Sequence, residues 1–91
     1  MEFKVPENKR ELFIKTSIWN SIIEVFKEKK EIDITNYLIS VQIKWNNILI
    51  KTNKPIINTE ALILHHFIIE KAEKKLKSMN IDFKWFDIKY I

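Results

Sequence analysis

The side chains that could bind a metal ion are few and poorly placed to do so. The two histidines, His65 and His66, are adjacent in the chain. Neighbouring residues of a helix point about 100° apart, so these rings cannot share a metal ion as an i, i+4 pair does. The sequence has no HExxH pattern and no cysteine. We therefore predict no metal site and interpret His65 as a core histidine with a hydrogen-bond partner.

The remaining candidates for catalytic chemistry also lack the required context. The acidic residues are scattered, and several have a lysine nearby, as Glu70 and Lys74 do at i, i+4 spacing. Glycine is absent from the sequence. Its absence excludes a P-loop, a dinucleotide-binding fingerprint and a nucleophile elbow, because each needs glycine where the backbone approaches a ligand or turns sharply. We predict that the protein is not an enzyme and that it uses no cofactor.

Lysine is the residue type that suggests a binding role. Lys and Arg outnumber Asp and Glu by 16 to 12, which gives a net charge of +4. This excess permits attraction to nucleic acid or to an acidic partner and requires neither. The candidate nucleic-acid contacts lie on the predicted hairpin and the second helix: Lys44, Lys51, Lys54, Lys71, Lys74 and Lys75. They form either a solvated surface, which a lysine-, isoleucine- and asparagine-rich composition favours, or a weak nucleic-acid surface that depends steeply on salt and lacks a stacking platform.

Length and composition predict a single domain over residues 1–91. Hydrophobic residues make up 46% of the chain, which is enough for one core without disulfides or metal. Residues 1–10 carry charges and no apolar segment, so they do not resemble a signal peptide. The longest apolar stretch, residues 61–69, is interrupted by histidines and is too short to span a bilayer. We expect no membrane partner and a cytoplasmic location.

Hydrophobic periodicity predicts a first helix from Glu7 to about Lys30. Its expected core face consists of large apolar residues at helical spacing, with Ile18 and Val25 at the edge: Leu12, Trp19, Ile22, Ile23 and Phe26. Two alternating strands follow, joined by a two-residue Asn46-Asn47 turn of type I′. This turn would pair Trp45 with Ile48, Ile43 with Ile50 and Val41 with Thr52. Trp45, Ile43 and Ile50 would then lie on the helix-covered face, and Lys44 and Leu49 on the other.

The second half of the chain predicts a helix from Lys54-Pro55 to about Asn80, followed by a strand region over residues 81–91. The expected core stripe of the helix is Ala61, Leu62, His65, Ile68, Ile69, Ala72, Leu76 and Met79. The alternation of the strand region changes phase near Lys84, which indicates a bulge or loop there. A helical crossover makes the last two strands parallel. The predicted fold class is therefore α+β, in the order α-β-β-α-β, with two helices on one face of a three-stranded mixed sheet.

Several apolar residues of this second helix fall outside its expected core stripe. Ile63, Leu64 and Phe67 point away from the stripe, so the first half of the helix is apolar nearly all round. Such a helix is either enclosed by its own fold or exposes a contact surface. The first helix could cover Leu64. For Ile63 and Phe67 we favour a partner surface over burial.

Two segments resemble the DciA family of small bacterial proteins associated with the replicative helicase. The first is Trp19-x-x-Ile22-Ile23, which matches a W-x-x-[IV]-[IV] helix motif. The second is the strand of residues 47–52 followed by residues 55–60, which match a strand and a short segment ending in Glu that opens a helix. The order of elements fits over residues 12–91.

The resemblance implies a KH-like fold and contact with the replicative helicase, with single-stranded DNA as a further partner. Ile57 corresponds to a position that is usually aromatic in the family and is tied to partner binding. With Ile63 and Phe67 of the apolar helix surface, it completes the expected partner-binding residues: Ile57, Ile63 and Phe67. Classical KH domains grip nucleic acid with a GxxG loop, which a chain without glycine cannot form. The alternative hypothesis is a structural protein–protein interaction module, such as a subunit of a larger assembly, with the same fold and no nucleic-acid role.

Overall fold

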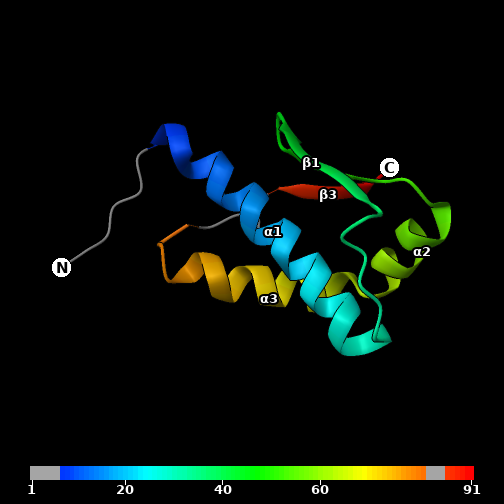
Figure 1. Ribbon diagram of the computed structural model, residues 1–91. Helices are drawn as coiled ribbons and strands as arrows, with labels where there is room; N and C mark the ends of the chain where they lie inside the picture. Colours follow the sequence, from blue (N-terminus) through cyan, green and yellow to red (C-terminus); the bar gives the residue numbers. More distant parts are fainter. Residues whose placement is uncertain (1–6, 82–85) are drawn as a thin grey trace.

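The computed structural model describes residues 7–81 and 86–91 (Figure 1). The described elements follow one another as α1 (Glu7–Lys30), β1 (Leu38–Lys44), β2 (Asn47–Thr52), α2 (Pro55–Ile63), α3 (His65–Lys77) and β3 (Asp87–Tyr90). The bounds of α1 agree with the predicted helix. Pro55 occupies the first turn of α2, as expected, because its missing N–H needs no partner there. Asn80, near the predicted end of the second helix, adopts a left-handed conformation (φ 57°) after α3, and asparagine tolerates this conformation better than most residues.

The three strands form one mixed sheet in the order β1-β2-β3. The first two strands are antiparallel and the last two are parallel, as predicted. In Figure 1, α1 crosses over α3, and the two helices pack together. The α1 helix also contacts β1, and α2 contacts β2 and β3. The inward strand residues Ile48 and Ile50 are fully buried against the helices. The α+β class and the mixed sheet are therefore confirmed.

The face that α1 buries differs from the predicted one. Its core residues are Ile14, Ser17, Ile18, Ser21, Ile22, Val25 and Phe26. Leu12, expected in the core, is 56% exposed, while Trp19 and Ile23 are only partly buried. The prediction counted large apolar residues alone and so ignored two small serines. Ser21 is buried because its Oγ donates a hydrogen bond to the Ser17 carbonyl oxygen (2.6 Å), which satisfies the hydroxyl inside the core.

The hairpin turn begins one residue earlier than predicted, so the predicted pairing of the two strands is wrong. The turn residues are Trp45 and Asn46, so Lys44 pairs with Asn47 and Ile43 pairs with Ile48. Ile43 and Ile50 still share the inward face, but Trp45 leaves the sheet and is 93% exposed. The earlier turn lets β2 start at Asn47 and places the Asn46 carbonyl oxygen where it accepts a hydrogen bond from the Asp87 amide of β3 (2.8 Å). A long-range contact of this kind cannot be read from the hairpin sequence.

The predicted second helix is two helices, separated at Leu64 (φ −90°, ψ 7°). Its buried residues are Ile57, Ala61, Leu64, Ile68, Ala72 and Leu76. Leu64 is thus core rather than outward-facing, and Leu62, predicted to be core, is 65% exposed. His65, Ile69 and Met79 are only partly buried. The break changes the helical phase, so a single stripe drawn through both segments assigns residues near it to the wrong face.

The third strand follows the alternation expected of its last residues. Phe86, Ile88 and Tyr90 pack partly buried against the core, while Asp87 and Lys89 are exposed. The phase change predicted near Lys84 falls in residues 82–85, which lie outside the described residues.

Candidate binding surfaces

The structure divides the six candidate lysines between two separate surfaces. Lys44 and Lys51 lie exposed on the outward face of the sheet, opposite the helices. Lys54 follows β2, and its Nζ lies 4.7 Å from the centre of the Tyr37 ring, which is a cation–π contact. The other three lysines belong to α3. A single continuous basic surface is therefore not formed.

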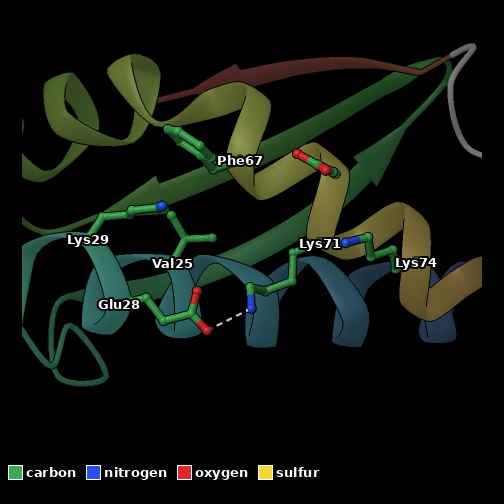
Figure 2. Close-up of a pocket in the computed structure, with 7 residues that line it drawn as sticks. Val25, Glu28, Lys29, Phe67, Lys71 and Lys74 are labelled. Carbon is green, nitrogen blue, oxygen red and sulfur yellow. Dashed lines mark hydrogen bonds and ion pairs between the residues drawn. The ribbon is translucent and has the colours of Figure 1, made fainter.

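Two of the α3 lysines are paired with carboxylates of α1. Lys71 Nζ donates a hydrogen bond to Glu28 Oε1 at 2.9 Å (Figure 2), and Lys75 pairs in the same way with Glu24. The Lys71 hydrogen bond lowers the pKa of Glu28 and raises the pKa of Lys71. Such pairs stabilise modestly at an exposed site. They also offset much of the charge that a phosphate would otherwise meet, which leaves Lys74 as the exposed member of the α3 group.

Sequence reasoning missed a third lysine on the outward face of the sheet. Lys89 is exposed on β3 and lies beside Leu49, which in turn pairs with Gln42. Lys44, Lys51 and Lys89 therefore share one face and make no ion pair with another described residue. Asp87 is the one acidic residue placed on this face by the described strands. The alternation of residues 86–90 predicts that Lys89 faces outward. The sequence does not indicate which neighbouring strand the last strand pairs with.

The three expected partner-binding residues are placed in three different environments. Ile57 is 7% exposed and belongs to the core. Ile63 is 61% exposed. Phe67 is partly buried, and Lys29 of α1 lies over its ring at 4.4 Å (Figure 2). The neighbouring His66 ring packs beside it. Ile57 is thus not available for contact on the folded domain, whereas Ile63 is fully available.

Two further apolar residues of α2 join Ile63 on the surface. Ile56 and Leu62 are each 65% exposed. At about 100° per residue, the three side chains fall within one arc of the helix that also contains Thr59. We call Ile56, Leu62 and Ile63 the α2 apolar surface. Its Leu62 end continues into a shallow groove between α2 and β3, lined by Asn58, Thr59, Leu62, Ile88, Lys89, Tyr90 and Ile91.

The His65 side chain has a specific hydrogen-bond partner on β3. His65 Nδ1 lies 2.9 Å from the Tyr90 hydroxyl, and the two rings meet edge to face. Burial raises the pKa of Tyr90, so its hydroxyl keeps its proton. The tautomer of the neutral His65 ring decides whether the hydroxyl or the Nδ1–H is the donor. Burial, and to a smaller degree His66, lowers the pKa of His65. The interpretation of His65 as a hydrogen-bonded histidine is confirmed, at a partly buried position.

This pair predicts a loss of stability in mild acid. Because the folded protein lowers the pKa of His65 below its ordinary value of 6.5, the unfolded chain takes up the proton first. The contribution to stability is complete above pH 6.5 and is lost as the pH falls below it. Thermal melts between about pH 7.5 and about pH 5.5 should show a fall in the midpoint that His65→Gln reduces. His66→Gln is the matched control, and an equal reduction by both variants would contradict the assignment.

Neither a metal cluster nor a membrane-crossing helix occurs within the described residues. No group of three or more His, Asp or Glu side chains in this part of the chain is arranged to hold a metal ion. None of the described helices is both long and apolar enough to cross a bilayer. The chain matches no protein-family model, no curated protein and no solved structure.

Proposed function

We propose that this protein is a non-catalytic binding domain of the DciA type with a KH-like arrangement of elements. In this proposal the α2 apolar surface contacts the replicative helicase, and the outward face of the sheet contacts single-stranded DNA. The resemblance at Trp19–Ile23 and over residues 47–60 supports the choice of partner. The element order, with a helical crossover between two parallel strands, is compatible with the family's fold.

The observation that carries the proposal is the exposure of three large aliphatic side chains on one short helix. Ile56, Leu62 and Ile63 are 61–65% exposed, although the same helix buries Ile57 and Ala61. Clustered exposed apolar residues of this kind mark interaction surfaces, because water contact with them is unfavourable and a partner removes it. The neighbouring groove along β3 extends the apolar area in one direction.

The charge distribution supports the second partner. Lys44, Lys51 and Lys89 share a sheet face that carries a single acidic residue in the described strands, Asp87. Unpaired lysines attract phosphates, whereas Lys71 and Lys75 are already paired with carboxylates of α1. We therefore assign the DNA contact to the sheet and not to α3.

The alternative, a structural interaction module without a nucleic-acid role, is favoured by the same α2 apolar surface. That surface needs only a protein partner. The two functions differ in whether the isolated chain binds single-stranded DNA and in which protein covers α2.

The test of the proposed function is direct binding between the purified chain and the replicative helicase of the same organism. Biolayer interferometry should detect binding that the double variant Leu62→Glu, Ile63→Glu abolishes, because it places two charges in the centre of the contact. Ile32→Glu, at a 43% exposed isoleucine in the loop after α1, is the matched control and should bind normally. Absence of binding by the unaltered chain, or equal binding by the double variant, would contradict the proposal.

A further inference from the structure

Trp45 occupies a position that is unfavourable for tryptophan in two independent ways. It sits in the β1–β2 turn with φ 57°, a left-handed conformation that favours asparagine or glycine over a bulky residue. Its side chain is also 93% exposed, the highest value among the exposed large hydrophobic residues of the described chain. Neither the turn nor the core gains from an indole ring here. Residues that break local rules without a structural gain point to function.

The surroundings of Trp45 carry positive charge on one face. Lys44 precedes it directly and lies on the outward face of the sheet, which Lys51 and Lys89 share. From the row of Lys44 to the row of Lys51 the face spans about 13 Å at a rise of about 3.3 Å per residue. Figure 1 shows the β1–β2 turn projecting at the top of the molecule, away from α2 and α3. Trp45 is therefore exposed in the turn at one end of this face, next to Lys44 in the chain.

We infer that Trp45 is a stacking platform for a base of single-stranded nucleic acid whose phosphates contact the lysines of the sheet face. An exposed aromatic ring next to a basic track is the arrangement by which proteins bind single strands without reading their sequence. The face carries three lysines and one acidic residue, Asp87, so its charge is complementary to a phosphate backbone. This charge favours nucleic acid as the ligand over a protein surface that lacks acidic residues. This inference rests on the nucleic-acid part of the proposed function and departs from the expectation that the protein lacks a stacking platform.

The test is fluorescence anisotropy with labelled oligo(dT) at low and at physiological salt. Trp45→Asn should weaken binding about tenfold at low salt, because base–aromatic stacking contributes that order of affinity per base. Asparagine suits a left-handed turn, so the hairpin should keep its thermal midpoint. Trp45→Phe keeps an aromatic face and should stay within about threefold of the unaltered chain. Ile32→Asn, at an exposed isoleucine of the loop after α1 that belongs to neither proposed surface, is the matched control and should not change binding to DNA.

Salt dependence and intrinsic fluorescence separate stacking from charge. Trp45→Asn should leave the slope of log affinity against log salt unchanged, whereas Lys51→Gln should reduce its magnitude by about 0.7, the value for one phosphate contact with a single strand. Oligo(dT) should quench the tryptophan emission of the unaltered chain and quench that of Trp45→Asn much less.

The outcomes that would overturn the inference are distinct from one another. Equal affinity and equal quenching for the unaltered chain and Trp45→Asn would remove the stacking role and leave the lysine face as a phosphate surface. No binding by the unaltered chain at low salt would overturn both the inference and the DNA part of the proposed function. In that case the proposed helicase contact of α2 would still be tested separately by its own binding measurement.

Discussion

Ile57→Glu is expected to unfold the domain, whereas Ile63→Glu should leave its thermal midpoint nearly unchanged. The two isoleucines belong to the same helix but are 7% and 61% exposed. A glutamate at Ile57 would put an unpaired carboxyl group into the core, which costs several kcal/mol against a total stability of about 5–10 kcal/mol. A surface substitution such as Ile63→Glu usually costs under about 0.5 kcal/mol. Thermal melts followed by circular dichroism measure both effects.

The two variants also decide which of the predicted partner-binding residues can contact a partner. If Ile57→Glu melts like the unaltered chain, Ile57 is exposed and the position remains available to a partner. If Ile63→Glu unfolds the protein, the α2 apolar surface is core and the helicase contact proposed for it has no basis. Phe67→Glu should give an intermediate loss, because the ring is only partly buried and Lys29 lies over it.

Local patterns predicted several features of this fold. The limits of α1 follow from one long amphipathic segment, the start of α2 from Pro55, and the end of α3 from Asn80, which can adopt positive φ. The parallel direction of β2 and β3 follows from the helical crossover between them. The helix limits depend on residues that are close in sequence, whereas the order of the strands in the sheet does not follow from them.

Contacts between distant segments account for the errors. The hairpin turn falls at Trp45-Asn46 and not at the better turn pair Asn46-Asn47, and in this position the Asn46 carbonyl oxygen accepts a hydrogen bond from β3. The break at Leu64 allows α2 to contact β2 and β3 while α3 packs along α1. Leu62, next to this break, is exposed for the same reason. None of these effects has a local sequence pattern.

The candidate site was predictable in part. Alternation along the strands placed Lys44 and Lys51 outward, where the structure has them. The pairing of Lys71 with Glu28, and of Lys75 with Glu24, joins residues more than forty positions apart and was invisible in the sequence. The alternation of the first strand and an Asn46-Asn47 turn predicted Trp45 on the helix-covered face, whereas the turn falls at Trp45 itself and leaves its side chain 93% exposed.

Phe26→Ala is expected to lower the thermal midpoint by about 15 °C or more, while Leu12→Ala on the same helix should lower it by a few degrees at most. Phe26 is 0% exposed and is the largest fully buried side chain of the described residues, whereas Leu12 is 56% exposed. Truncating a buried phenylalanine costs about 3–5 kcal/mol, since it removes apolar contacts and leaves a cavity between α1 and the rest of the core. Calorimetry or circular dichroism of both variants measures the difference. Equal losses would mean that α1 buries the face predicted from its large apolar residues, with Leu12 inside, and that the packing of Ser17 and Ser21 against the core is wrong.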